Sequence, residues 1–343
     1  TIQNGSASDG GAIYSSNSNP VFENLIIKNS TASNSGGGIY LHNNSSAVLN
    51  KLTIINNSAQ NGGGIYLDSS NPTITNIVLS NNNADSTGGA IAMYSNSNPG
   101  IYNAVIYDNY SGLFGGAMQI SNSNPTINYS TIIANHGEYH GGVLYLTNES
   151  EVVVTNSILY DNIPEQFFIN DPEDSLTVSF SNVQGGYEYV DFSHLASNVS
   201  STLITWAQSN IDVNPLFNDA SNDDFSLSDY SMSIGSGNSG NIINPDINGL
   251  ERPAPAGSDP DIGAYENLRS IPDVWLTLEN DQYFINEDST LRFNPVLNDS
   301  IVNIHLVDLA IVDSANHGTL QIVNDSTISF QPDQNYFGTD TIL

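Results

Sequence analysis

The sequence has no cysteine among its 343 residues, which excludes a disulfide framework and a zinc–thiolate site. Basic residues are also scarce: five Lys and Arg stand against 36 Asp and Glu, so the formal net charge is −31 with neutral histidines. A nucleic-acid binder needs a basic face that displaces counterions from phosphates, so this class is excluded. Docking on anionic lipid headgroups is disfavoured for the same reason.

Long apolar runs are missing as well. No stretch approaches the roughly 18–20 apolar residues of a membrane-spanning helix, so we predict no membrane insertion. There is no initiator methionine and no visible signal peptide, and we expect a fragment or processed piece of a longer polypeptide. Still, 38% of residues are hydrophobic and only 12% are charged. This balance favours a folded, elongated, β-rich protein over a disordered acidic chain.

What the sequence does contain is an internal repeat. A pair of glycines followed by a small and an apolar residue occurs six times in the first half, at spacings of 26, 26, 26, 27 and 26 residues. A second motif keeps step with it: an apolar residue, two variable residues and an asparagine. The second glycines of the pairs are Gly11, Gly37, Gly63, Gly89, Gly116 and Gly142, and the asparagines are Asn29, Asn56, Asn81, Asn109, Asn135 and Asn162.

A fixed period of this length indicates a solenoid, a propeller or an array. Each period contains short alternating apolar runs separated by Gly, Asn-Pro and Ser-Asn turns, and none carries helical periodicity. Three strands and three turns per period describe one coil of a parallel β-helix, which adds about 4.8 Å along the axis. We expect the glycines to allow positive φ at the corners and the asparagines to form a hydrogen-bonded column, so both sets are structural.

The paired motifs resemble the polymorphic outer-membrane-protein repeat of right-handed parallel β-helix surface proteins, over about residues 1–165. The resemblance implies an all-β fold with a right-handed parallel β-helix of about 26 residues per coil, and an exposed location. It implies no chemistry.

The period breaks after Asn162, and we expect irregular closing coils and a cap over residues 166–268. The hexapeptide from Asp261 to Glu266 resembles the choice-of-anchor Q ending of bacterial secreted β-helix proteins, which implies export and retention through a separate C-terminal anchor. A solenoid end exposes unpaired backbone groups and an open apolar cross-section. Four aromatic residues are predicted to cover that end, with an aromatic carbohydrate platform as the alternative: Trp206, Phe217, Phe225 and Tyr265.

Residues 272–343 form a second predicted domain after the β-helix of residues 1–268. Short strands at close turn spacing suggest a β-sandwich. Segments such as Val296-Leu297-Asn298-Asp299 and Tyr336-Phe337-Gly338-Thr339 resemble bacterial Ig-like and cadherin-like repeats. We expect the final strand of this domain to be short or missing.

Catalysis finds little support in the sequence. The 200 residues between Lys51 and Arg252 contain no Lys or Arg, so the solenoid has no such side chain to neutralise a uronate or act as a base. Glycosidases need two carboxylates about 5–9.5 Å apart, and the ten acidic residues up to residue 170 form no repeating pair. The weak catalytic or metal candidates are His136, Glu138 and His140, for which an ordinary exposed turn is the alternative.

Calcium is the cofactor that the composition favours. Residues 171–343 hold 26 of the 36 acidic residues, and calcium takes six to eight oxygen ligands. Junctions of cadherin-like modules are stiffened by calcium, as the resemblance implies. The alternative is a solvated acidic surface. The predicted ligands are Asp259, Asp261, Glu266, Asp273, Glu287, Asp288 and Asp299.

Two functions remain open at this point. The first is a non-enzymatic bacterial protein, secreted or on the cell surface, whose rigid rod binds glycans or surface proteins and associates end to end or laterally with further copies. The second is a carbohydrate-active enzyme, a polysaccharide lyase or glycosidase, with a cleft near residues 136–140 or 165–200.

Overall fold

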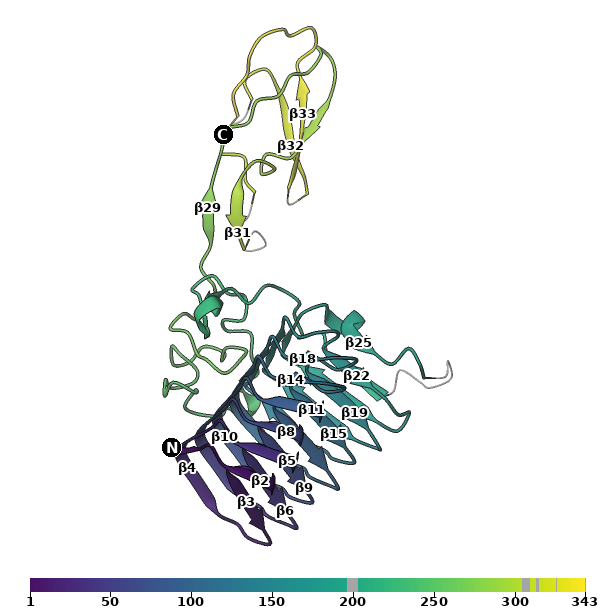
Figure 1. The fold of residues 1–343 in the computed structure, drawn as a ribbon. Helices are drawn as coiled ribbons and strands as arrows, with labels where there is room; N and C mark the ends of the chain where they lie inside the picture. Colours follow the sequence, from purple (N-terminus) through teal and green to yellow (C-terminus); the bar gives the residue numbers. More distant parts are fainter. Residues whose placement is uncertain (196–202, 304–308, 313–314, 325, 343) are drawn as a thin grey trace. The chain divides into compact units, whose positions relative to one another are not determined.

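The structure is a computed structural model that describes residues 1–195, 203–303, 309–312, 315–324 and 326–342. It divides into two compact units, Thr1–Ile271 and Pro272–Leu343. The first unit is a stack of short parallel strands with loops along one flank, and the second is a small antiparallel β domain (Figure 1). Residues 196–200 of the predicted excursion lie outside the described residues.

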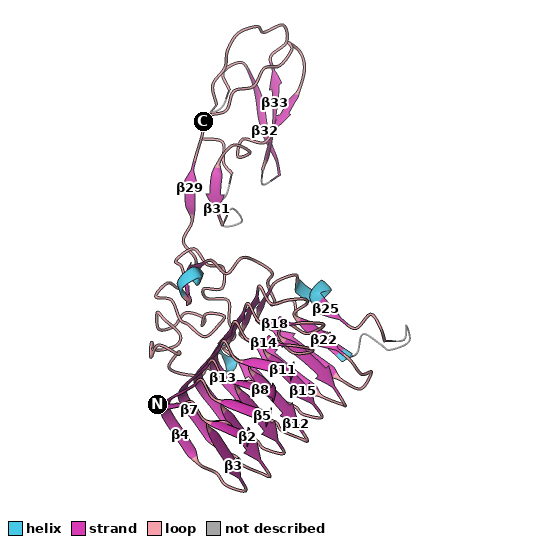
Figure 2. Cartoon of the chain, in the orientation of Figure 1, coloured by secondary structure: helices cyan, strands magenta, loops and turns pink. Residues whose placement is uncertain are grey.

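The first unit is built from three parallel sheets that the chain visits in turn (Figure 2). The first sheet contains β1 (Ile2–Gln3), β4 (Val21–Lys28), β7 (Val48–Ile55), β10 (Thr73–Ser80), β13 (Gly100–Tyr107), β16 (Thr126–Asn128), β17 (Thr131–Ile133), β20 (Glu151–Thr155), β21 (Ile158–Tyr160), β23 (Ser175–Ser179), β24 (Asn182–Val183) and β26 (Ile204–Trp206). The second contains β2 (Ser6–Asp9), β5 (Thr31–Ser35), β8 (Ser58–Asn61), β11 (Asn83–Thr87), β14 (Tyr110–Ser111) and β18 (His136–Gly137). The third contains β3 (Ile13–Ser16), β6 (Ile39–His42), β9 (Ile65–Asp68), β12 (Ile91–Tyr94), β15 (Met118–Ser121), β19 (Leu144–Thr147), β22 (Phe167–Ile169) and β25 (Val190–Asp191).

Each strand pairs with the equivalent strand of the next coil. In the third sheet Ile13 lies beside Ile39, and Ile39 lies beside Ile65, which reproduces the 26-residue period of the sequence. Because equivalent residues stack, each position in the repeat forms a column along the axis. The architecture is therefore a parallel β-helix, as the repeat predicts.

The interior of the coils is filled by aliphatic columns from all three sheets. Ile39, Ile65, Ile91 and Leu144 are fully buried in the third sheet, and Ile106 is fully buried in the first. Strand alternation leaves the intervening side chains on the outer surface. The core is continuous from the first coils to Val190, so coil burial, rather than disulfides, stabilises the rod.

A column of buried asparagines occupies one corner of the coils. The Oδ1 atom of Asn109 accepts hydrogen bonds from the backbone N–H and the Nδ2 atom of Asn82, both at 3.0 Å. The same pattern joins Asn109 to Asn135, and Asn135 to Asn162. In the early coils the residues of the column are Asn57 and Asn82, each one position later in the chain than predicted.

The prediction was therefore wrong for Asn29, Asn56 and Asn81, and right for the other three residues. These three lie at the same corner, one residue before the column position, with φ of 54°, 55° and 53°. Two adjacent asparagines at positions 56–57 and 81–82 made either register fit the motif. The left-handed region tolerates Asn, so both residues of each pair have a structural role.

The two glycines of each pair have different structural roles. The first residue takes the positive φ, for example 62° at Gly62 and 68° at Gly88. The second residue lacks this conformation but stacks closely on the next coil, since a Cβ on Gly63 would lie 2.5 Å from the carbonyl oxygen of Asn83. The predicted structural column from Gly11 to Gly142 thus exists for steric reasons, and the left-handed corner lies one residue earlier.

The chain after the last coil covers a flank of the rod more than its end. Trp206 packs against the end of the core, in edge-to-face contact with Phe167 at a centroid distance of 6.5 Å. Phe217, Phe225 and Tyr265 instead pack with Val105, Tyr107 and Ile133 on the outer face of the first sheet. The cap prediction was wrong for these three residues, because strands such as β13 expose a second apolar face that also needs burial.

This flanking segment has few regular elements of its own. It contains the antiparallel pair β27 (Phe217–Asp219) and β28 (Asp224–Leu227), and the short 3-10 helices η3 (Ala220–Asn222) and η4 (Ser239–Asn241). A further 3-10 helix, η1 (Gly186–Tyr189), precedes β25. In the described part of the chain, every helix falls well short of the length and hydrophobicity that crossing a bilayer requires.

In the described residues of the second unit, all strand pairs are antiparallel. Strand β29 (Trp275–Thr277) pairs with β31 (Ser300–Val302), and β33 (Thr327–Pro332) lies between β30 (Leu291–Phe293) and β32 (Gly318–Asn324). Two small antiparallel sheets give the Ig-like β-sandwich that the sequence predicts.

Candidate functional site

The candidate site is an open groove on the outer face of the third sheet, with a volume of about 410 Å³. We call it the aromatic groove. Two of its lining residues, Tyr145 and Phe168, come from β19 and β22. These strands are neighbours near the end of the regular coils (Figure 1). Its lining residues are Leu113, Phe114, Tyr139, His140, Tyr145, Phe168 and Asn170.

The register of the coils brings these side chains together. Tyr145 lies beside Phe168 on neighbouring strands, and Phe114 is bridged to His140 on the adjoining turn. Tyr145 alternates with Leu144 and Leu146 of the interior, so its ring lies on the outer side of the sheet, where neighbouring rings leave Tyr145 only 8% and Phe168 only 5% exposed. Stacking of equivalent positions thus converts scattered aromatic residues into one surface.

The rings in the groove are nearly parallel. The centroids of Tyr145 and Phe168 are 5.2 Å apart with planes inclined by 6°, and those of Phe114 and Tyr145 are 4.5 Å apart at 20°. His140 stacks on Phe168 at 3.9 Å, and His194 stacks on the same ring at 4.9 Å. These stacked rings hold one another in place and form a pre-organised platform.

Aromatic side chains also occur on this face in the first coils. Tyr14, Tyr40 and Tyr66 occupy one outward column, with centroid distances of 5.3 Å and 5.0 Å between successive rings. Tyr14 is 53% exposed. In the next two coils the same position holds Ala92 and Gln119, before Tyr145. The tyrosine column and the aromatic groove are therefore two separate aromatic patches on the third sheet.

A second hollow, of about 470 Å³, is linked to the groove through a carboxylate. Its lining includes Glu165, Tyr187, Glu188 and Asp191. The Oε1 atom of Glu165 lies 3.4 Å from Nδ1 of His140 and accepts a 2.7 Å hydrogen bond from the backbone N–H of Gly141. Residues 136–140 and the start of the predicted excursion at 165 thus meet in space.

Two of the three carboxylates that line this second hollow, Glu165 and Asp191, have opposite pKa shifts. Burial raises the pKa of Glu165 above its ordinary value, although Gly141 and His140 oppose the rise. Burial also acts to raise the pKa of Asp191, but hydrogen bonds from Ser193 and the two nearby histidines outweigh it and lower the pKa. Glu165 therefore holds its proton more readily than Asp191 does.

The three weak catalytic candidates do not form one cluster. Nε2 of His136 lies 3.8 Å from Oε2 of Glu138, which also accepts a hydrogen bond of 3.1 Å from the Tyr110 hydroxyl. His140 turns away from this pair toward Glu165 and Phe168. The structure therefore places His140 in the aromatic groove and leaves His136 and Glu138 on the exposed surface beside it.

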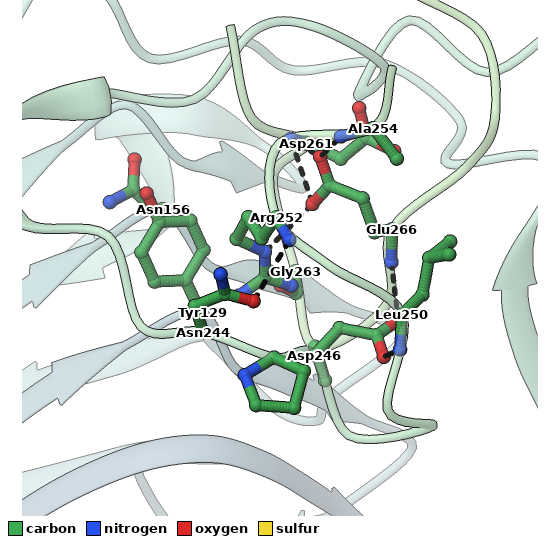
Figure 3. A network of polar contacts seen from close by, with 12 residues as sticks. Tyr129, Asn156, Asn244, Asp246, Leu250, Arg252, Ala254, Asp261, Gly263 and Glu266 are labelled. Carbon is green, nitrogen blue, oxygen red and sulfur yellow. Dashed lines mark hydrogen bonds and ion pairs between the residues drawn. The ribbon is translucent and has the colours of Figure 1, made fainter. Parts of the chain in front are cut away.

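The flanking segment is fastened to the rod by a buried polar network (Figure 3). The Nε atom of Arg252 lies 2.7 Å from Oε2 of Glu266, and both side chains are 0% exposed. The guanidinium carbon lies 4.1 Å from the centre of the Tyr129 ring, and the guanidinium also donates to Asn103 at 2.9 Å. Asp246 accepts from the backbone N–H of Glu266 at 2.9 Å.

Two predicted calcium ligands belong to this network. Asp261 accepts hydrogen bonds from the backbone N–H groups of Gly235 and Asn267, at 2.8 Å and 2.6 Å. Glu266 accepts from Arg252 and from the Ala254 backbone. These carboxylates fasten the flanking segment and have other partners, so their geometry does not form a metal site.

The other five predicted ligands are spread over both units. Asp259 lies in the first unit, and Asp273, Glu287, Asp288 and Asp299 lie in the second. Asp288 accepts from the backbone N–H of Asn335 and Asp299 from that of Glu279, each at 2.8 Å. Within the described ranges, no group of three His, Cys, Asp or Glu side chains could hold a metal. Calcium binding stays a prediction.

The main residues of the groove were missed at the sequence level. Phe114, Tyr145 and Phe168 belong to no local motif, because they come from three different coils. A signal was present: Tyr14, Tyr40, Tyr66 and Tyr145 each follow the apolar residue after a glycine pair. The same position holds Ala92 and Gln119 in the other two repeats, so the aromatic pattern is incomplete.

Comparisons with known proteins agree with the two units. A family described as right handed beta helix region matches residues 11–214, and a family described as bacterial Ig domain matches residues 273–343. Searches of curated proteins and of solved structures found no match. The polymorphic outer-membrane-protein repeat and the choice-of-anchor Q ending are not named by these matches and stay predictions.

Proposed function

Since the chain belongs to the right-handed β-helix family and continues into a bacterial Ig domain, we propose that it is a non-enzymatic bacterial surface or secreted protein that binds glycans. The β-helix is the rigid, glycan-binding part, and the Ig-like unit is a spacer in a modular polypeptide. One observation carries the proposal: the exposed Tyr139 ring lines a groove whose floor is a rigid stack of aromatic side chains.

The groove has the properties of a binding surface for sugar rings. Aromatic rings offer broad apolar faces, and neighbouring polar atoms supply directional hydrogen bonds. Here the Tyr145 hydroxyl donates to Asn170 at 2.9 Å, and the exposed Tyr139 lines the same groove. Because the rings are fixed by stacking, binding a sugar costs little ordering entropy.

Two aromatic patches on one sheet suit a polymer better than a single sugar. The ring column from Tyr14 to Tyr66 lies on the same sheet as the groove, and two coils with Ala92 and Gln119 at this position separate them. A linear polysaccharide that lies along the rod contacts several rings at once, and multiple weak contacts add through effective concentration.

A glycan-array screen tests this proposal. Tyr139→Ala removes a ring that is 59% exposed, so the variant keeps its fold while it loses a contact surface. The matched control is Tyr102→Ala, which removes a tyrosine from β13 in the first sheet. We expect the wild type and the control to bind the same glycans and Tyr139→Ala to bind them about tenfold more weakly. No bound glycan, or equal binding by all three proteins, would refute the proposal.

A second candidate function is glycoside hydrolysis, which the opposite pKa shifts of Glu165 and Asp191 favour. Both residues line the second hollow beside the groove. A Glu165→Gln variant separates the two functions: cleavage of a bound polysaccharide by the wild type and not by this variant would establish an enzyme. Binding that persists in the variant, without cleavage by either protein, supports the binding function.

A further inference from the structure

The aromatic groove is surrounded by carboxylates and has no Lys or Arg side chain in its lining. Residues 52–251 contain no Lys or Arg, and they include every residue that lines the groove and the second hollow. The bordering carboxylates are Glu138, Glu165, Asp171, Glu188 and Asp191. The titratable groups that oppose them are the three histidines His136, His140 and His194.

Asp171 and Asp191 hold their charge at the two sides of the rings. Asp171 accepts hydrogen bonds from the Thr147 hydroxyl and the Asn148 backbone, both at 2.7 Å. Burial acts to raise its pKa, but these hydrogen bonds outweigh burial and lower it. Asp191 lies beside Phe168 in the next coil, so it continues the column of Tyr145 and Phe168.

The pairing of the exposed Tyr139 ring with nearby carboxylates suits a cationic ligand. An ammonium group gains energy over an aromatic face and gains more beside a carboxylate. A uronate polymer would bring its own carboxylates to this surface without a Lys or Arg to neutralise them, and like charges repel.

We propose that the aromatic groove binds a polysaccharide of amino sugars that carry free ammonium groups. The sugar rings stack on the exposed ring of Tyr139 and contact the outer edges of Tyr145 and Phe168, while the ammonium groups point to the bordering carboxylates. This inference rests on the proposed glycan-binding function and names the class of glycan.

A matched pair of polymers tests the inference. Soluble β-linked glucosamine oligomers are compared with N-acetylated oligomers of the same length and linkage, at a pH where the free amines are charged. We expect the free amine form to bind about tenfold or more tightly at low salt. The advantage shrinks as salt is raised, because exposed charges are screened. A uronate oligomer of equal length is expected not to bind.

Protein variants locate the effect. The double variant Glu138→Gln, Glu188→Gln removes two exposed carboxylates beside the groove, and Glu151→Gln with Glu149→Gln removes two from a turn and strand elsewhere. Only the first pair should reduce the advantage of the free amine form.

Each outcome decides one or both proposals. Equal binding of the two glucosamine forms, or tighter binding of the acetylated or uronate form, overturns the charge inference and leaves glycan binding intact. The charge inference is also overturned if the free amine form binds more tightly to the same extent in both double variants. The attraction would then come from the net charge of the protein and not from the carboxylates beside the groove. No binding of any glycan, in this panel or on the array, overturns both proposals.

Discussion

Arg252 and Glu266 form an ion pair in which neither side chain is exposed, and the Nε–Oε2 distance is 2.7 Å. The pair lies in the segment that returns along the flank of the rod, and Arg252 also contacts Asn103 and Tyr129 of the coils. One buried cation thus joins the last part of the first unit to its middle coils.

Replacing Glu266 with Gln leaves the Arg252 charge buried without its partner. We expect the free energy of unfolding to fall by about 3–5 kcal/mol, the usual cost of breaking a buried pair. Chemical denaturation measures this loss. The control is Asp229→Asn, which breaks the Arg269 pair of 3.1 Å on the exposed surface and should have little effect, because solvent screens it. Similar losses in both variants would contradict the assigned role of the buried pair.

The stability of the first unit should depend on pH through Asp261. Burial, and then the charge of Glu266, raises the pKa of Asp261 to about 8. The folded protein therefore binds a proton that the unfolded chain releases at about pH 4, so this contribution is full below pH 4 and is lost as pH rises toward 8.

An Asp261→Asn variant tests this assignment. It should lose less stability than the wild type between pH 5 and about pH 9, measured as the change in thermal unfolding midpoint. Because the amide cannot accept both hydrogen bonds of Asp261, the variant is expected to be less stable than the wild type at pH 5. Parallel pH curves for the two proteins would show that Asp261 does not titrate in this range.

Substitutions in the asparagine column should destabilise the protein, whereas substitutions of the asparagines one position earlier should not. Asn82→Ala removes a buried acceptor and a buried donor, and we expect a loss of about 1–3 kcal/mol. Asn81→Gly, at the exposed neighbour with φ of 53°, should change stability little because glycine adopts this conformation freely. Denaturant unfolding of both variants decides between the two registers. If the register predicted from the sequence were right, Asn81→Gly would cause the larger loss of stability and Asn82→Ala the smaller one.

The close stacking of the second glycine in each pair should also be measurable. A Cβ on Gly89 would lie 2.3 Å from the carbonyl oxygen of Gly116, so Gly89→Ala forces neighbouring coils apart. We expect a marked fall in the thermal midpoint or failure to fold. Gly240→Ala, where the nearest atom to the Cβ is a side-chain oxygen at 3.0 Å, is the control and should unfold near the wild-type temperature.

The repeat made the fold predictable from the sequence. The site was not predictable in this way, because its residues are distant in the sequence and meet only in the folded protein. A strict period fixes the register of parallel strands, so columns such as Ile39 and Ile65 follow directly from the sequence. Where adjacent residues are both Asn, as at Asn81 and Asn82, the pattern alone could not choose between them. The fold therefore followed from spacing, and the register at one corner did not.

The flanking segment and the groove were harder to predict for a physical reason. The contacts of Phe225 with Tyr107, at a centroid distance of 5.1 Å, join residues that no repeat relates. The His140 ring was noticed, but its partners Glu165 and Phe168 lie one coil later, where the period shortens. Regular spacing in the sequence does not reveal that the chain returns along the flank of the rod, or which residues become neighbours once the period shortens.

Binding of a polysaccharide without cleavage can be tested in one experiment on the aromatic groove. The polysaccharide that binds best is incubated at length with the wild-type protein and with Tyr139→Ala, and the chain length of the recovered polymer is measured. We expect the wild type to retain polymer of unchanged length and the variant to retain much less. Shortened chains with the wild type, or equal retention by both proteins, would contradict this expectation.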